Sequence, residues 1–378
     1  MKKLMSLGLA MLLVLSLFGC TAKQPGPSTP GSTESTGPSE EVPAQEGELP
    51  LAGKRIAYIL NVVSTDIFQL AAKAAKDTAE ALGATCDVYF TDTDNVRFQD
   101  TVSTCANQGY DAMFLSHGNQ ETSYDLVTGL VEKGIKVVCF DTQFVNASGE
   151  NVTIDGVTQM FQDDQGMAAL LLDYVLDMYP EKVEAGEPVK ILKIWRGPGI
   201  SPFDRRQESY LKYEQEGLIE TLEVLGPSDP ANGESSMASV MAAALPKYPE
   251  GTVDAIWCCY DSYGRGVYVA LSEAGRTDIP MVSVDISNQD INYMMDGTEV
   301  WQACATVDFT TIGQQGVRIL SMMLKGEETE SVYNLTPSIV TYDQLTADSN
   351  VTNLGDIVEG YGINDDHISD WMKPYLVG

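Results

Sequence analysis

From residue 55 onward the sequence alternates between short runs rich in β-forming residues and longer stretches with the 3.6-residue period of a helix. The first cycle reads RIAYIL (55–60), DIFQLAAKAAKDTAEALG (66–83) and TCDVYF (85–90), and the cycle repeats up to a strand at 136–140. Strands that alternate strictly with helices form parallel sheets with right-handed crossovers, and helices cover both faces. The alternation therefore predicts an α/β fold built on doubly wound parallel sheets.

A second series of the same kind begins near Asp164. Its expected helices are 164–179, 204–222, 235–245, 262–275, 288–297 and 310–326, and its expected strands are 188–195, 254–260, 280–284 and 300–307. The two series are similar in size, so they predict two α/β units with residues 146–163 as the first connection between them.

The N-terminus, MKKLMSLGLAMLLVLSLFGC, has two lysines, an apolar stretch and then a small residue and a cysteine, as in a secretory signal. The apolar stretch is shorter than the about 20 residues that a membrane-spanning helix needs. Leu17, Phe18 and Gly19 before Cys20 resemble a bacterial lipobox, although Phe18 is bulkier than usual, and an ordinary signal peptide is the alternative. We expect residues 1–19 to be a signal peptide and Cys20 to carry a lipid that holds the protein at the outer face of the cytoplasmic membrane.

Residues 20–52 consist mostly of Pro, Gly, Ser, Thr and Glu, with almost nothing to bury. Such a composition predicts a disordered tether. The whole chain has 23 basic and 54 acidic residues. Nucleic acid is excluded as a partner, because phosphate binding requires a basic face.

The chain has seven cysteines and no C-x-x-C pair. Apart from Cys20 they are Cys86, Cys105, Cys139, Cys258, Cys259 and Cys304, and most of them fall in strand-like apolar runs. A free thiol in such a run behaves as a small apolar side chain, so we expect buried thiols. A disulfide remains open at this stage.

Three apolar runs end on an acid: KGIKVVCFD at Asp141, VDAIWCCYD at Asp261 and IPMVSVD at Asp285. In open parallel sheets ligands bind beyond the carboxyl ends of the strands, so these positions favour ligand contact. The alternative is helix capping by the carboxylate. Capping fits Asp261 equally well because a helical run follows it, whereas Asp141 and Asp285 favour the ligand role.

Catalysis explains these acids poorly. The chain has two histidines, His117 and His367, and lacks H-E-x-x-H, G-x-S-x-G and phosphate-loop motifs. We therefore expect no enzyme activity, no metal and no cofactor. An ionised aspartate accepts hydrogen bonds from two neighbouring hydroxyls, arginine donates to oxygens, and aromatic rings cover apolar C–H faces. Acids, an arginine and aromatics at strand ends thus favour a small polyhydroxylated ligand.

From about Lys54 to Thr341 the chain resembles the sugar-binding branch of the type I periplasmic binding proteins, which serve ABC transporters. The resemblance rests on the order and spacing of VVCFDTQ, GPGISPFDRRQESY, AIWCCYDSYGRGVYVALSEAG, MVSVDIS and GQQGVRILSMMLKGE. It implies two doubly wound lobes joined by a three-segment hinge that close on a ligand. The implied N-terminal lobe is 53–161 plus 308–327, the C-terminal lobe is 162–307 plus 328–345, and 346–378 form a C-terminal extension.

The resemblance also implies a set of ligand-binding residues. Phe68 matches a stacking aromatic, Asp141 and Asp285 match two acids, and Arg206 matches the arginine, with Arg205 as the alternative if the alignment shifts by one. The complete predicted set is Asp66, Phe68, Asp141, Arg206, Tyr260, Asp261, Asp285 and Asp308.

Three members of this set mark departures from the family. Tyr260 stands where ribose binders have an asparagine, Asp66 lies in a first loop that lacks the family asparagine, and Asp308 lies beside a replaced hinge residue. These departures leave the ligand open. His117 and Phe203 are weaker candidates, and for His117 a surface loop is the preferred interpretation.

The implied function is that of an extracytoplasmic, monomeric solute-binding lipoprotein that captures a sugar or polyol and delivers it to the permease of an ABC importer. One alternative is a ligand-sensing module for a signalling receptor. A nucleoside, inositol or a furanosyl signal molecule is the alternative ligand.

Overall fold

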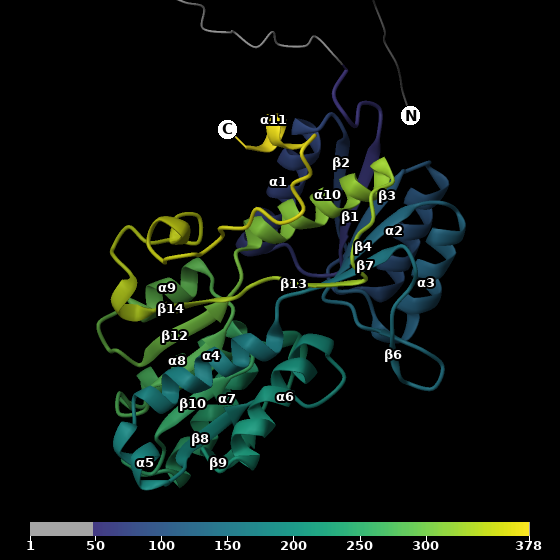
Figure 1. Ribbon diagram of the computed structural model, residues 1–378. Coiled ribbons are helices and arrows are strands. Elements are labelled where there is room, and N and C mark those ends of the chain that lie inside the picture. The colour runs from purple at the N-terminus through teal and green to yellow at the C-terminus, as the bar shows by residue number, and fades with distance from the viewer. Residues whose placement is uncertain (1–47, 378) are drawn as a thin grey trace, which may run out of the picture. The chain divides into compact units, whose positions relative to one another are not determined.

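The computed structural model describes residues 48–377 (Figure 1). The predicted signal peptide 1–19, the predicted lipidation site Cys20 and the predicted tether up to residue 47 lie outside the described residues. The end of that predicted tether is packed against the fold at Leu51, which is buried and whose amide donates to the carbonyl of Leu82. Within the described part, no helix is both long enough and apolar enough to cross a membrane.

The first sheet contains six parallel strands in the order β13-β7-β4-β3-β1-β2. They are β1 (Arg55–Leu60), β2 (Thr85–Phe90), β3 (Ala112–Ser116), β4 (Lys136–Phe140), β7 (Val157–Phe161) and β13 (Val332–Asn334). The helices packed on it are α1 (Asp66–Ala81), α2 (Asn95–Asn107), α3 (Gln120–Glu132) and α10 (Phe309–Lys325). Alternate residues of β1 enter two different cores: Tyr58 belongs to the core that contains α1 and α10, and Ile59 to the core that contains α2 and α3. Both faces of the sheet are thus covered.

The second sheet has the order β14-β12-β11-β10-β8-β9, and only β14 runs antiparallel to its neighbour. Its strands are β8 (Val189–Ile194), β9 (Ile219–Leu225), β10 (Ala255–Cys258), β11 (Met281–Val284), β12 (Trp301–Thr306) and β14 (Ser338–Thr341). Its helices are α4 (Asp164–Asp177), α5 (Pro180–Ala185), α6 (Ser201–Gln215), α7 (Gly233–Ala244), α8 (Asp261–Glu273) and α9 (Asn288–Met294). The predicted α/β fold with two parallel-sheet lobes is confirmed.

The chain passes between the two sheets three times. It leaves the first sheet after β7 and enters α4, which packs on the second sheet, and it returns from β12 into α10. The third passage joins β13 of the first sheet to β14 of the second. The two sheets are thus joined by short segments near residues 162, 307 and 336.

Three parts of the sequence prediction differ from the structure. The expected connection at 146–163 contains two strands: β6 (Asn151–Val152), which forms a short hairpin with the preceding β5 (Phe144–Val145), and then β7. The expected helix 204–222 ends early, because Gly217 has a φ of +73° and the edge strand β9 follows it. Residues 328–345 were placed in the second lobe, but β13 pairs with β7, so 332–334 belong to the first sheet.

The six cysteines beyond Cys20 all have buried free thiols, in agreement with the sequence prediction. The predicted C-terminal extension contacts elements of both lobes. The amide of Val351 donates to the side chain of Asn288 on α9, and Arg318 on α10 donates to the carbonyl of Asn364. Figure 1 shows this segment in yellow, ending in α11 (Lys373–Leu376) near α1.

Helices α1 and α10 approach each other closely at Gly313, where an added Cβ would lie 2.1 Å from the carbonyl oxygen of Ala71. We therefore expect Gly313→Ala to force the helices apart and to lower the free energy of unfolding by about 1–3 kcal/mol. Gly129→Ala on α3 is the matched control, because an added Cβ there meets nothing within 4 Å. It should raise the free energy of unfolding by about 0.5–1 kcal/mol. Urea denaturation of both variants measures the difference, and equal effects would contradict the close packing.

Candidate functional site

A cavity of about 400 Å³ is lined by residues of both lobes, within the range of about 300–1,000 Å³ typical of small-molecule sites. From the first lobe it takes Val62, Val63, Thr65, Ile67, Phe68, Thr93, His117 and Phe309, and from the second lobe Arg196, Ile200, Pro202, Phe203, Arg206, Pro230, Ala231, Gly233, Tyr260, Ser262, Tyr263 and Asp285. Gln162, on the first passage between the lobes, completes the lining.

Three residues that immediately follow strands have left-handed backbones: His117 (φ 57°) after β3, Asp141 (φ 49°) after β4 and Asp285 (φ 70°) after β11. In each, the amide continues the strand ladder, donating to Phe140, Met160 and Ala305 respectively. Asp and His adopt this conformation more readily than most residues with a side chain. Such strained backbones cluster at functional sites, and here they lie where the two sheets meet the cavity.

Two adjacent arginines at the start of α6 link the buried acids. Arg205 donates to Asp141 (2.8 Å) and to Asp164 (2.7 Å), and Arg206 donates to the other oxygen of Asp164 (2.7 Å) and to the carbonyl of Cys259 (2.6 Å). Burial alone would lower the pKa of Arg206, but the neighbouring acids, led by Asp164, raise it overall. Arg206 is therefore a fixed positive charge in the wall of the cavity.

Asp285 lines the cavity beside this arginine, with 3.8 Å between its Oδ2 and Nη2 of Arg206. Its Oδ1 is buried and has no hydrogen-bond partner within the described residues. Burial, opposed by Arg206 and reinforced by Asp261, raises the pKa of Asp285 to about 7. A donor from outside the described residues is needed to satisfy this oxygen.

Gln162 and His117 complete the polar end of the cavity. Gln162 donates to Asp141 (2.5 Å), while its own Oε1 is buried and lacks a partner among residues 48–377. Burial and the nearby Asp164 raise the pKa of Asp141 to about 6. Burial and then Arg206 lower the pKa of His117 to about 4, so its ring is neutral at neutral pH.

Aromatic rings from both lobes line the rest of the cavity. Phe68 packs edge-on against His117 and Phe309, each with ring centroids 5.5 Å apart. On the second lobe Phe203 packs on Tyr260 at 5.7 Å and on Tyr263 at 6.0 Å. Rings on both sides of a polar end can cover the apolar faces of a small ring-shaped ligand.

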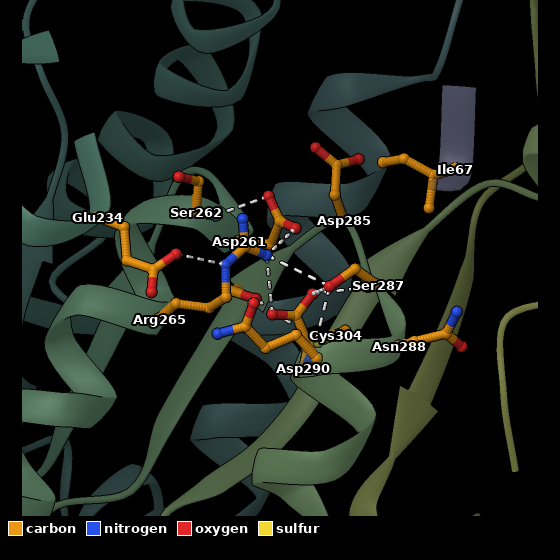
Figure 2. Close-up of polar contacts among 12 residues, drawn as sticks. Ile67, Glu234, Asp261, Ser262, Arg265, Asp285, Ser287, Asn288, Asp290 and Cys304 are labelled. Atoms are coloured by element: carbon orange, nitrogen blue, oxygen red, sulfur yellow. Dashed lines mark hydrogen bonds and ion pairs between the residues drawn. The ribbon is translucent and has the colours of Figure 1, made fainter. Parts of the chain in front are cut away.

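Asp261 takes part in a separate ion-pair cluster rather than in the cavity lining. Figure 2 shows Arg265 among Glu234, Asp261 and Asp290, with N–O distances of 3.0, 2.7 and 3.0 Å. This cluster joins α7, α8 and α9, so its role is to hold the second lobe together behind the cavity. Within residues 48–377, no group of three or more His, Cys, Asp or Glu side chains is arranged to hold a metal ion.

Asp66 and Asp308 also lie outside the cavity lining. Asp66 accepts a hydrogen bond from Asn288 (3.0 Å), which connects α1 of the first lobe to α9 of the second. Asp308 caps α10 by accepting from the amide of Thr310 (2.9 Å). Both acids thus have partners from the protein.

Comparison with known proteins gives the family. Residues 56–328 match the family described as a periplasmic binding protein domain. The chain belongs to the periplasmic binding protein family. A solved structure of a sugar ABC transporter protein from Yersinia enterocolitica is 32% identical, with a TM-score of 0.74, over 85% of this chain and 94% of that chain. No curated protein matches the chain.

Two further solved structures share the fold of this periplasmic binding protein. One is a 5-methylthioribose transporter solute-binding protein from Thermotoga lettingae, in complex with 5-methylthioribose, at 21% identity and a TM-score of 0.72, covering 85% of this chain and 96% of that one. The other is an ABC transporter solute-binding protein from Agrobacterium vitis with bound allitol, at 18% identity and a TM-score of 0.66, covering 80% and 98%. The family resemblance inferred from the sequence is confirmed.

Of the predicted ligand-binding residues of this periplasmic binding protein, Phe68, Arg206, Tyr260 and Asp285 line the cavity. Asp141 is buried beneath it, held by Arg205 and Gln162. The structure does not bring Asp66, Asp261 and Asp308 into the lining. The ligand roles of the whole set stay predictions.

Sequence reasoning missed several lining residues. His117, interpreted as part of a surface loop, belongs to the cavity wall, and Gln162 and Tyr263 were not singled out. His117 carried the same signal as the three acids, a polar residue directly after an apolar strand. Gln162 had no such signal, because the strand β7 that it follows was not recognised.

The buried carboxyl of Asp285 predicts a pH dependence. An unfolded aspartate titrates near 3.9, so between about pH 4 and 7 the folded protein holds a proton that the unfolded chain releases. Asp285 therefore stabilises the fold at low pH, and this contribution is lost as the pH rises through 7. Asp285→Asn has no such proton, so we expect its melting temperature, relative to wild type, to rise between pH 5 and 8.

Differential scanning calorimetry across this range, without ligand, measures the effect. Asp125→Asn on α3 is the matched control, because it changes an exposed carboxyl that does not line the cavity. If the difference in melting temperature between Asp285→Asn and the wild type stays constant with pH, the raised pKa of Asp285 is contradicted.

Proposed function

We propose that this periplasmic binding protein captures a sugar or a sugar-like polyol in the cavity between its lobes and delivers it to the permease of an ABC importer. The observation that carries the proposal is a pair of buried acceptors that have no hydrogen-bond partner within residues 48–377, Oδ1 of Asp285 and Oε1 of Gln162, in the same cavity as the cationic Arg206. Buried polar atoms are nearly always hydrogen-bonded, so these two require donors from a ligand or water.

The chemistry of the cavity favours hydroxyl groups. A hydroxyl both donates and accepts, so one polyol can donate to Asp285 and Gln162 while it accepts from Arg206. Carbon-bound hydrogens of the same ligand can lie on Phe68 and Phe203. The sugar transporter identity of the Yersinia relative and the sugar and polyol held by the two fold neighbours support this ligand class.

Closure follows from the distribution of these contacts. Phe68 and His117 come from the first lobe, whereas Phe203, Arg206 and Asp285 come from the second. A ligand can therefore contact both groups only when the lobes are closed, and its higher affinity for that form shifts the population toward it. The closed form is the one that we propose the permease recognises.

Periplasmic binding proteins are extracytoplasmic. We propose that the lipid on Cys20 anchors this one at the outer face of the cytoplasmic membrane. The lipobox-like residues before Cys20 support this arrangement. The protein acts as a monomer by binding alone, without a cofactor and without turnover.

The test is thermal unfolding of the purified protein against pentoses, hexoses, hexitols, inositol and nucleosides. A ligand present at 100 times its dissociation constant adds about 2.7 kcal/mol to the free energy of unfolding, which is a clear shift of the melting temperature. We expect one sugar or polyol to give such a shift. At pH 8, where most of the Asp285 carboxyl is ionised, Asp285→Asn should weaken its binding by about 10- to 100-fold, because a neutral amide replaces a charged acceptor.

Asp125→Asn is the matched control and should bind the ligand as the wild type does. If only nucleosides shift the melting temperature, the ligand is a nucleoside and not a sugar. Loss of binding in both Asp→Asn variants, or no shift with any compound, would contradict the proposed function.

A further inference from the structure

Within residues 48–377, the buried atoms of the cavity lining that have no hydrogen-bond partner are both acceptors. They are Oδ1 of Asp285 and Oε1 of Gln162, on side chains of residues that are only 5% and 4% exposed. The orientation of Gln162 is set by Asp141, which accepts from its amide nitrogen (2.5 Å) and so leaves the amide oxygen for the cavity. The cavity therefore requires a ligand rich in hydrogen-bond donors.

The buried charges at this cavity do not balance. Two arginines, Arg205 and Arg206, meet three acids, Asp141, Asp164 and Asp285. Nη2 of Arg205 lies 2.8 Å from Oδ1 of Asp141, and Nε of Arg206 lies 2.7 Å from Oδ1 of Asp164, so these four side chains form two close ion pairs. Asp285 is the acid in excess, because its Oδ2 is 3.8 Å from Nη2 of Arg206, beyond hydrogen-bond distance.

The wider surroundings of Asp285 add negative rather than positive charge. Burial raises the pKa of its carboxyl, Arg206 opposes this effect, and three other acids reinforce it. Figure 2 shows the carboxyl of Asp285 beside the Arg265 cluster, without a contact to it. One cation against three acids makes a further positive charge next to Asp285 favourable. The charged and titratable groups near Asp285 are Arg206 on α6, Asp164 on α4, Asp141 after β4, Asp261 and Tyr260 at the start of α8, and Tyr361 of the C-terminal extension.

The other basic side chains of the lining do not remove this excess. Arg196 belongs to the loop between β8 and α6 and is exposed. Water and salt screen an exposed charge, whereas they screen buried acids much less. Burial lowers the pKa of His117 to about 4, so its ring carries no charge at neutral pH. The charge of Asp285 must therefore be compensated inside the cavity, by a proton or by a ligand.

We infer that the ligand is an amino sugar or an amino polyol, in which an ammonium group replaces one hydroxyl and donates to Asp285. The inference rests on the proposed function and specifies its ligand class. An ammonium group has three donors and no lone pair, so it suits an uncompensated carboxylate better than a hydroxyl, whose oxygen needs a donor of its own. The remaining hydroxyls of the ligand donate to Gln162 and accept from Arg206.

Isothermal titration calorimetry at pH 7 with matched sets of compounds tests the inference. The sets are glucose, glucosamine and N-acetylglucosamine; galactose, galactosamine and N-acetylgalactosamine; and glucitol, glucamine and N-acetylglucamine. In at least one set the amine should bind about tenfold more tightly than its hydroxyl parent, because a hydrogen bond between two charged groups is stronger than one to a neutral group. The N-acetyl compound keeps the nitrogen without the charge and should bind more weakly than the amine.

Asp285→Asn tests whether this carboxyl is responsible. The variant keeps the shape of the side chain and removes its negative charge, so the preference for the amine over its parent should fall about tenfold. Asp125→Asn, an exposed acid outside the cavity lining, is the matched control and should keep the preference. A second readout is the proton balance, measured by titration in two buffers with different ionisation enthalpies. Because the pKa of Asp285 is about 7, binding of the amine at pH 7 should release protons from the wild type and not from Asp285→Asn.

The outcomes separate the inference from the proposed function. If compounds without a charged amine bind as tightly as the amines, or if they alone bind, the inference is overturned and the proposed function stands. If the amines are preferred but Asp285→Asn keeps both the preference and the proton release, the assignment of the ammonium group to Asp285 is overturned. If no sugar, polyol or amine derivative binds, the proposed function fails and the inference fails with it.

Discussion

The structure depends on a buried network of ion pairs, in which two arginines of α6 contact acids of both lobes. Arg205 joins Asp141 of the first lobe to Asp164 of the second, and Arg206 joins Asp164 to the neighbourhood of Asp285. Burying a charge costs several kcal/mol unless hydrogen bonds and an opposite charge compensate it. Asp164 compensates both arginines, with one oxygen for each. In the described part of the chain Asp285 keeps one buried oxygen without a hydrogen-bond partner.

Position along the strands explains why these side chains meet. The carboxyl ends of parallel strands lie on one edge of a sheet, and the polar residues after β3, β4 and β11 adopt left-handed backbones there. Because α6 follows β8 and α8 follows β10, these helices begin at the same edge, and Phe203 and Arg206 on α6 and Tyr260 at the start of α8 lie there. The site is thus a consequence of topology, and its specificity depends on which residues occupy a few strand and helix ends.

The sequence predicted this topology because alternation of strands and helices is a strong signal over many residues. It failed at β9, where Glu220 and Glu223 in the run IETLEVL suit a helix as well as an edge strand, and only the pairing with β8 decides. It failed at β13 because a three-residue strand has no period. The sequence revealed the acids at the strand ends. It did not reveal which of them faces the cavity and which pairs with Arg205 or Arg265, because that depends on side-chain positions and not on a local sequence pattern.

The ion pair between Arg205 and Asp141 connects the two lobes without any ligand, and so does the hydrogen bond between Asn288 and Asp66. Opening must break both, and it must also move the C-terminal extension, which contacts Asn288 on α9 and Arg318 on α10. Contacts within the protein therefore contribute to the stability of the closed form. A ligand needs only to add the remaining difference in free energy between the open and closed forms.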